Sequence, residues 1–210
     1  MTKYKAIIFD LDNTIYAVES IGESLFSSLF QLIEREGNYQ GDMEAIKKAI
    51  QRKPFQVVSK EFHFSEKLTE NCLRLLSNLE YNDIIKPFDD YALIKKIDCL
   101  KFLVTTGFEK LQKSKIRQLN LENDFTEYFI IDPSVSSLTK KDIFKNIKQQ
   151  YNLSSREMLV IGDDIDSEIQ AGKELGIDTI VYDYNNSHQN LKDYVIITNY
   201  NQLNKLKKIL

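Results

Sequence analysis

The sequence predicts an α/β protein with a doubly wound parallel sheet and a small all-helical domain inserted near the N-terminus. Two observations carry this prediction. Through most of the chain, short apolar runs alternate with segments of helical periodicity, which is typical of parallel strands joined by crossover helices. The long stretch 17–85, in contrast, has helical periodicity and no run typical of a strand.

Each expected strand is a short, mostly apolar run of the kind that is buried in a sheet. The runs lie at residues 6–10, 100–105, 128–131, 158–162, 178–182 and 194–197. Helical periodicity follows at 108–119, 140–151 and 167–176, and we expect a further helix at the C-terminus. Because strand–helix–strand units form right-handed crossovers, the carboxyl ends of these strands should share one edge of the sheet.

The inserted stretch repeats apolar residues at helical spacing, with breaks at 37–41 and 53–54. We therefore expect two domains, an α/β core made of residues 1–16 and 86–210, and a helical domain of residues 17–85. An aromatic cluster in the helical domain either forms its core, which we favour, or lines a substrate pocket: Phe55, Phe62, His63 and Phe64.

Two carboxylates directly follow the first strand. Asp10 and Asp12 lie where ligands bind in open α/β sheets, at the carboxyl end of a strand. Two acids in such a position repel each other unless a cation or a proton lies between them. Their position therefore indicates a site for a divalent metal.

Later strand ends supply partners for this chemistry. Thr105 ends the second strand, Lys140 opens a helix, and Asp163 follows the strand at 158–162. Carboxylate oxygens select a hard cation such as Mg²⁺, while a hydroxyl and an ammonium group suit a phosphate. A shared sheet edge would bring these groups together.

In four segments, taken in order, the chain resembles the haloacid dehalogenase-like hydrolases, in their phosphatase branch. The segments are 10–14, 104–107, 140–141 and 162–164. The resemblance implies a Rossmann-like core and identifies the helical insertion as a cap over the strand ends. It also implies a Mg²⁺ cofactor.

The resemblance implies a role for each matching residue. Asp10 is similar to the nucleophile that forms an aspartyl phosphate, and Asp12 to the general acid and base. Thr105 and Lys140 match the groups that bind the phosphoryl oxygens. Asp10, Asp163 and the main-chain carbonyl of Asp12 match the metal ligands. Because Asp12 must carry a proton for part of the cycle, we expect its acidic neighbours and partial burial to raise its pKa.

Two assignments stay open at this point. Lys141 could replace Lys140 as the phosphate ligand, although the spacing to residues 143–144 favours Lys140. The second acid of the last segment is Asp164, Asp166 or Glu168: spacing from Asp163 favours the glutamate, and adjacency favours Asp164.

The expected function is Mg²⁺-dependent hydrolysis of a phosphomonoester on a small metabolite. A nucleotide or a sugar phosphate is a plausible substrate, because residues 13–16 resemble the same stretch of pyrimidine nucleotidase-like relatives. The alternatives are phosphoglucomutase-like transfer of the phosphoryl group and a phosphate-binding regulatory module without turnover. Intact acids, hydroxyl and lysine at every chemical position argue against the regulatory module.

The charge, the hydropathy and the residue composition of the chain argue against several classes of partner and site. A net charge of −3 offers no basic surface to nucleic acid, and no apolar stretch approaches the ~20 residues of a membrane span. The chain enters its first strand almost at once, so we expect no signal peptide and a cytoplasmic location. Two cysteines, Cys72 and Cys99, are expected to be unpaired, and two histidines match no zinc site. The sequence predicts no oligomeric state.

Overall fold

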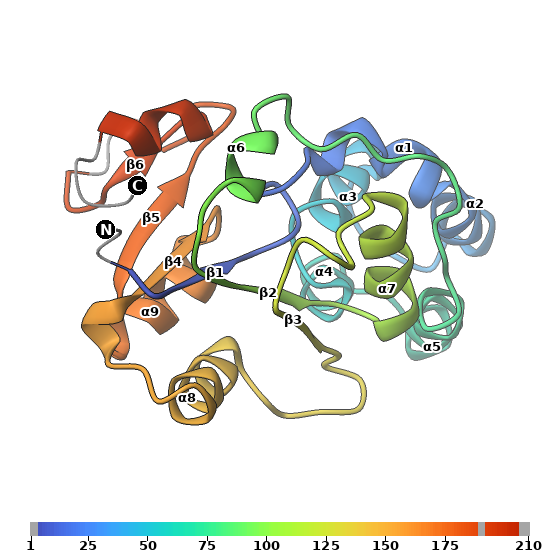
Figure 1. The fold of residues 1–210 in the computed structure, drawn as a ribbon. Coiled ribbons are helices and arrows are strands. Elements are labelled where there is room, and N and C mark those ends of the chain that lie inside the picture. Colours follow the sequence, from blue (N-terminus) through green and yellow to red (C-terminus); the bar gives the residue numbers. More distant parts are fainter. Residues whose placement is uncertain (1–3, 189–191, 206–210) are drawn as a thin grey trace.

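The computed structural model describes residues 4–188 and 192–205 and contains one six-stranded sheet, seen in Figure 1. Its strands are all parallel and follow the spatial order β3-β2-β1-β4-β5-β6. In chain order they are β1 (Ala6–Phe9), β2 (Leu100–Thr106), β3 (Glu127–Ile131), β4 (Met158–Gly162), β5 (Asp178–Tyr182) and β6 (Ile196–Ile197). The predicted doubly wound α/β fold is confirmed.

β1 lies at the centre of the sheet, where the direction of winding reverses. Its Ile8 is in register with Phe102 of β2 on one side and with Val160 of β4 on the other. Ligands bind at such a switch point, outside the carboxyl ends of the strands. The loops after β1, β2 and β4 therefore meet around one position.

Alternate residues of β1 are buried in two separate cores. Ile7 and Phe9 belong to the larger core, which also contains residues of α7 (Glu109–Gln118) and of the helical insertion. Ala6 and Ile8 belong to the smaller core under α8 (Lys140–Gln150) and α9 (Gln170–Glu174). Because side chains alternate between the two faces of a strand, a short apolar run can hold helices on both sides.

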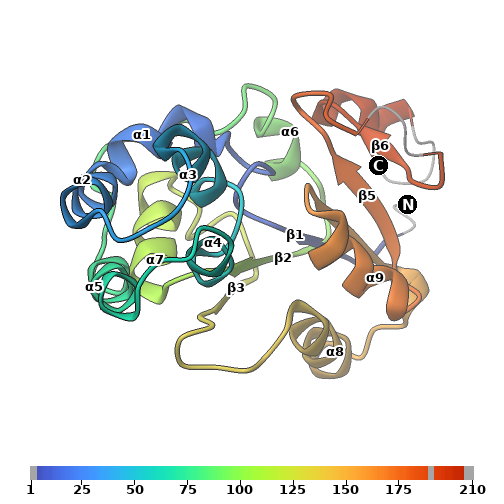
Figure 2. The ribbon, with the colours of Figure 1, turned by 180° about the vertical axis from the view of Figure 1, so that it is seen from behind.

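Helices fill the chain between β1 and β2. Figures 1 and 2 show the helices α1 to α5 gathered beside α7 at one side of the molecule. Among the described residues of this segment no strand is present. The helices are η1 (Val18–Ser20), α1 (Gly22–Leu25), α2 (Ser27–Glu36), α3 (Met43–Ile50), α4 (Phe55–Glu61), α5 (Glu66–Leu76) and α6 (Ala92–Lys95), the last leading into β2.

Local signals explain where these helices begin and end. Asp42 and Ser65 cap α3 and α5, each accepting a backbone N–H three residues on. Gly37 ends α2 in a left-handed conformation at φ 65°, which glycine adopts without strain. The described residues include no helix with the length and apolar character that a membrane span requires.

The C-terminal part departs from expectation in detail. β6 has two residues, and the helix that follows is a 3₁₀ helix, η4 (Tyr200–Lys205); residues 206–210 lie outside the described part of the chain. The short 3₁₀ helix η2 (Ser155–Glu157) precedes β4. The buried hydroxyl of Tyr200 donates a 2.6 Å hydrogen bond to the carbonyl of Thr14, in the loop after β1.

Candidate active site

The hydrogen bonds of β1 continue into the first site residue. The Asp10 N–H donates to the carbonyl of Ile161 in β4 at 3.0 Å, so the nucleophile candidate is held by the sheet itself. Beyond it, Asn13 adopts φ 57°, a conformation that asparagine tolerates better than most residues. Its side chain accepts the N–H of Val18 at 3.1 Å and so fixes the reversal of the chain.

Lys140 is the first residue of α8 and points into the site. Thr139 and Asp142 form a capping box, which sets where the helix begins. The Lys140 Nζ lies 2.6 Å from Oδ1 of Asp10 and 2.7 Å from Oε2 of Glu168. All three side chains are buried.

The neighbouring lysine points elsewhere. Lys141 pairs with Glu174 on the surface, at 2.6 Å between Nζ and Oε2. The structure thus places Lys140 in the site and Lys141 outside it, as the spacing argument favoured.

Three carboxylates form one cluster at this sheet edge. Asp10, Asp163 and Glu168 each offer an oxygen within 4.8 Å of the other two. Asp163 follows β4, and Glu168 comes from a π-helical turn, η3 (Ile165–Ile169), that precedes α9. The Glu168 Oε1 also accepts the N–H of Asp164 at 2.7 Å.

The other acids of this segment lie outside the cluster. Asp164 caps the helical turn by accepting the N–H of Asp166, and the side chain of Asp166 is exposed. Of the three acids left open by the sequence, Glu168 is therefore the one that joins Asp10 and Asp163.

The cluster carries more negative than positive charge. Burial raises the pKa of Asp10 to about 7, with Glu168 and Asp12 adding to the rise and Lys140 opposing it. Burial, with Asp10 and Glu168, raises the pKa of Asp163 to about 9. Burial lowers the pKa of Lys140, but the two carboxylates outweigh this effect and raise it. Three oxygen donors and a single ammonium group fit a hard divalent cation, which would supply the missing positive charge.

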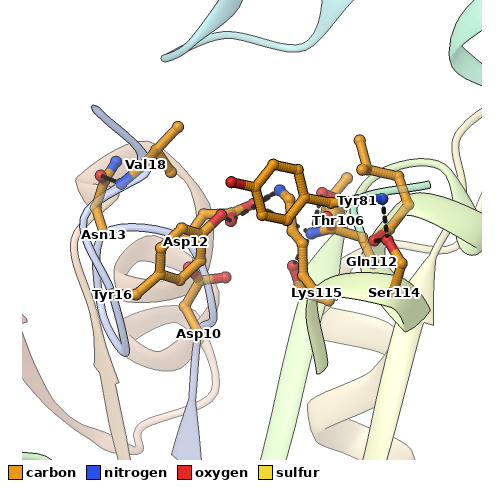
Figure 3. A network of polar contacts seen from close by, with 12 residues as sticks. Asp10, Asp12, Asn13, Tyr16, Val18, Tyr81, Thr106, Gln112, Ser114 and Lys115 are labelled. Carbon is orange, nitrogen blue, oxygen red and sulfur yellow. Dashed lines mark hydrogen bonds and ion pairs between the residues drawn. The ribbon is translucent and has the colours of Figure 1, made fainter. Parts of the chain in front are cut away.

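Asp12 lies in a second polar network, shown in Figure 3. Lys115 Nζ contacts its two carboxylate oxygens at 2.9 and 3.0 Å, and Gln112 Nε2 donates to Oδ2 at 3.1 Å. The Tyr16 hydroxyl donates to Oδ1 at 2.5 Å.

This network overturns one prediction. We expected a raised pKa for Asp12, and that prediction is wrong. Burial alone raises this pKa, but the charge of Lys115 and the hydrogen bonds from Tyr16, Lys115 and Gln112 outweigh burial and lower it. The acidic neighbours seen in the sequence are therefore not the charges that dominate at this carboxylate.

Thr105 is the remaining residue predicted for the site. Its side chain is buried, and its Oγ1 accepts a 2.6 Å hydrogen bond from Gln112 Nε2. It lines the same cavity as Asp10, Asp12, Lys140 and Asp163. All the candidate residues thus meet at one place, although they come from four separate segments.

The cavity has a volume of about 340 Å³ and is lined in part by residues of the helical insertion. Residues 50–56, which run from the end of α3 through the connecting loop into the first turn of α4, contribute a large part of its wall. Phe55 lines the cavity and also packs edge-on against Phe64. Phe62 and Phe64 pack against the larger hydrophobic core. The aromatic cluster therefore serves mainly as core, as favoured, with one member facing the cavity.

Sequence reasoning missed Tyr16, Gln112 and Lys115. A polar residue on a polar helix is usually solvated, and α7 is rich in lysine and glutamine. A signal does exist: Lys115 falls four residues after Leu111 and four before Leu119, within the apolar stripe of the helix. The three missed residues, Tyr16, Gln112 and Lys115, are all buried.

Comparisons with known proteins agree with this geometry. The chain is 22% identical to glyceraldehyde 3-phosphate phosphatase of Pyrococcus furiosus, over 93% of this chain and 90% of that protein. It is 25% identical to the pyrimidine 5'-nucleotidase PynA of Streptococcus pneumoniae, over 85% and 84%. A crystal structure of the HAD-hydrolase YfnB of Bacillus subtilis bound to magnesium superposes with a TM-score of 0.66 at 18% identity, covering 99% of this chain and 100% of that one.

The family model of haloacid dehalogenase-like hydrolases matches residues 4–176, which include all four motif segments. The structure holds these segments around a single sheet edge, on the fold of the solved relatives. The chain therefore belongs to the haloacid dehalogenase-like hydrolases.

Proposed function

We propose that this hydrolase is a Mg²⁺-dependent phosphatase that cleaves a phosphomonoester of a small metabolite through an aspartyl phosphate on Asp10. One observation carries the proposal. The Asp10 carboxylate lies 2.6 Å from the ammonium group of Lys140 and forms a cluster with the carboxylates of Asp163 and Glu168. Phosphoryl transfer depends mainly on in-line positioning and on neutralising negative charge, and this cluster supplies groups for both.

In the proposed reaction the Asp10 carboxylate attacks phosphorus and the bond from phosphorus to the leaving oxygen breaks. Asp12 gives its proton to that oxygen. Asp12 then takes a proton from a water molecule, whose oxygen attacks the aspartyl phosphate and releases inorganic phosphate, restoring the Asp10 carboxylate. Thr105 and Lys140 hold the phosphoryl oxygens throughout. The lowered pKa of Asp12 suits the second half, where it acts as a base.

The proposed metal ligands are Asp10, Asp163 and the main-chain carbonyl of Asp12, which the family resemblance implies, together with Glu168, which lies in the same carboxylate cluster. Bound there, Mg²⁺ supplies positive charge that allows an anionic carboxylate to approach an anionic phosphate. The raised pKa values of Asp10 and Asp163 support this assignment, because burial and the neighbouring carboxylates disfavour the ionised forms, which a bound cation would stabilise.

We propose the domain division expected from the sequence, with residues 1–16 and 86–210 as the core and 17–85 as the cap. The cavity supports this division, since its wall combines Asp10 and Lys140 of the proposed core with residues 50–56 of the proposed cap. In this role the insertion excludes water from the reacting phosphate and contacts the leaving group.

The named relatives indicate the class of substrate. Glyceraldehyde 3-phosphate and a pyrimidine nucleotide are the substrates in the names of two relatives, so we propose a sugar phosphate or a nucleotide for this chain. The size of the cavity, about 340 Å³, suits a small ester.

The test is a screen of sugar phosphates, nucleoside monophosphates and 4-nitrophenyl phosphate with purified protein and Mg²⁺, in which free phosphate is measured. We expect turnover that EDTA abolishes and added Mg²⁺ restores, and that Asp10→Asn abolishes without loss of fold. Wild-type rates in Asp10→Asn would disprove the covalent mechanism. A phosphorylated isomer formed without free phosphate would instead show transfer of the mutase type.

A further inference from the structure

The network around Asp12 contains two residues of α7 that the proposed reaction does not use. Figure 3 shows Gln112 and Lys115 extending from α7 toward Asp12. Both side chains are almost completely buried, at 1% and 4% exposure, whereas the Asp12 side chain is 28% exposed. A buried charge or amide is costly unless it is paired, so these groups are fixed by their partners.

Lys115 holds both oxygens of one carboxylate. Its Nζ lies 2.9 Å from Oδ1 and 3.0 Å from Oδ2 of Asp12, and these are the ion-pair contacts that it makes among the described residues. An ammonium group placed between the two oxygens restrains both the position and the rotation of the carboxylate. The Lys115 ammonium group also lies over the ring of Tyr16, and the Tyr16 hydroxyl donates a hydrogen bond to the same carboxylate.

Gln112 links two motifs that are far apart in the sequence. Its Nε2 donates to Oδ2 of Asp12 at 3.1 Å and to Oγ1 of Thr105 at 2.6 Å. The amide therefore sets the distance between the proposed acid and the proposed phosphate-binding hydroxyl. Gly107 leaves room for this side chain, because a Cβ atom there would lie 3.1 Å from its Cδ and Cγ atoms.

The helix that carries these two residues is itself anchored. Ser114, between them, is buried and accepts the backbone N–H of Tyr81 at 2.8 Å. It also donates to the carbonyl of Leu111 at 2.7 Å. α7 therefore holds Gln112 and Lys115 in place from a position outside the carboxylate cluster.

We propose that Lys115 and Gln112 are positioning residues that fix the Asp12 carboxylate relative to Thr105, and so to the leaving-group oxygen. The inference rests on the proposed function, because it assigns a purpose to the geometry of the acid. Misplacing a reacting group by about 1 Å can lower a rate by about 10²-fold. The gain in rate from restraining Asp12 can therefore outweigh the cost of burying the lysine.

The kinetic test uses aryl phosphates that differ only in the acidity of the leaving phenol, from 4-nitrophenyl to phenyl phosphate. The variants are Lys115→Met, Lys115→Arg and Gln112→Leu. Lys113→Met is the matched control, because Lys113 lies on the outer face of the same helix and pairs with Glu109. Poor leaving groups need the proton from Asp12 most, so its misplacement should affect them most.

We expect Lys115→Met to lower kcat by about 10²-fold for phenyl phosphate and by much less for 4-nitrophenyl phosphate, with KM nearly unchanged. Gln112→Leu should change kcat in the same sense, Lys115→Arg should recover part of the loss, and Lys113→Met should match wild type. A rise in KM at constant kcat would mean that Lys115 binds substrate directly. An equal loss for every leaving group would mean a merely structural role. Either result would overturn the proposal.

A second measurement does not depend on activity. Thermal unfolding of Lys115→Met, Asp12→Asn and the double variant tests whether the two side chains are coupled. Loss of Lys115 alone leaves an unpaired carboxylate, and we expect Tm to fall by roughly 5–10 °C. The Tm of the double variant should fall by clearly less than the sum of the decreases in the two single variants.

Additive changes in Tm would overturn the pairing itself. If wild type releases no phosphate from any ester, the proposed function fails, while the unfolding cycle still decides whether Lys115 restrains Asp12. Failure of the positioning proposal and failure of the phosphatase proposal are therefore distinguishable.

Discussion

Glu168 packs so closely on Gly162 that a Cβ atom at position 162 would lie 2.1 Å from the glutamate Oε1. No real pair of such atoms approaches to this distance, so a side chain at position 162 would displace the carboxylate. Gly162, the last residue of β4, therefore leaves the space that the side chain of Glu168, six positions later, occupies.

Gly162→Ala tests the importance of that carboxylate for metal binding. The added methyl should push Glu168 out of the cluster and raise the Mg²⁺ concentration for half-maximal phosphate release by on the order of 10-fold. Gly172→Ala is the control, because its Cβ would meet Thr179 and Val160 rather than an acid. An unchanged Mg²⁺ dependence in Gly162→Ala would remove Glu168 from the proposed ligands.

The two adjacent lysines should respond differently to the same substitution. Lys140→Met leaves Asp10 and Glu168 buried without their shared partner, and we expect kcat to fall by about 10²–10³-fold. Lys141→Met removes a surface ion pair worth at most about 1 kcal/mol, so its rate should stay within about twofold of wild type. Steady-state kinetics of both variants provide the measurement. Similar rates in both would contradict the assignment of Lys140.

The pKa values predict how stability changes with pH in the metal-free protein. Asp10 and Asp163 keep their protons to higher pH when folded than when unfolded, because burial raises their pKa values to about 7 and about 9. Their contribution to the free energy of unfolding is full below about pH 4. It is lost as the pH rises through those two folded values.

Mg²⁺ should reverse this loss, because it binds the ionised carboxylates. The difference in Tm between protein with Mg²⁺ and protein with EDTA should therefore grow from about pH 5 to about pH 9. Differential scanning fluorimetry across this range measures it, and Asp163→Asn should flatten the dependence. A difference in Tm that does not vary with pH would show that these carboxyls do not hold the metal.

Tyr200→Phe removes a single buried donor. The carbonyl of Thr14 would lose its 2.6 Å hydrogen bond, and we expect the free energy of unfolding to fall by about 1–3 kcal/mol. Because Thr14 lies in the loop of Asp12, kcat should fall as well. Tyr91→Phe is the control: its hydroxyl bonds Asp124, away from that loop, so it should lower stability alone. Urea unfolding and phosphate release separate the two effects.

The sheet could be predicted from sequence because each strand is a short apolar run with a polar end. The run 158–162, for example, coincides with β4, and parallel winding then requires that Asp10, Thr105 and Asp163 share an edge. Lys140 could be placed because a capping box fixes where its helix begins. These signals are local in the sequence. The site residues, which are far apart in the chain, come together because of the topology of the sheet alone.

The remaining features of the site depend on three-dimensional geometry that no local sequence pattern determines. Spacing favoured Glu168 and adjacency favoured Asp164, and only the three-dimensional arrangement shows that Glu168, on the π-helical turn, joins the cluster. The charge that dominates at Asp12 comes from Lys115, 103 positions later in the chain. A long-range ion pair of this kind cannot be predicted from the neighbours of Asp12 in the sequence, and so the direction of its pKa shift could not be predicted either.

The hydrogen bond from Tyr200 to Thr14 lies partly beyond the portion of the chain that the family pattern covers, which ends at residue 176. A chain shortened to that boundary would retain every motif and lose the hydroxyl that donates to the loop of the first motif, together with β5 and the edge strand β6. Residues beyond 176 therefore support the loop that carries Asp12, and a protein made of the motif segments alone would lack this support.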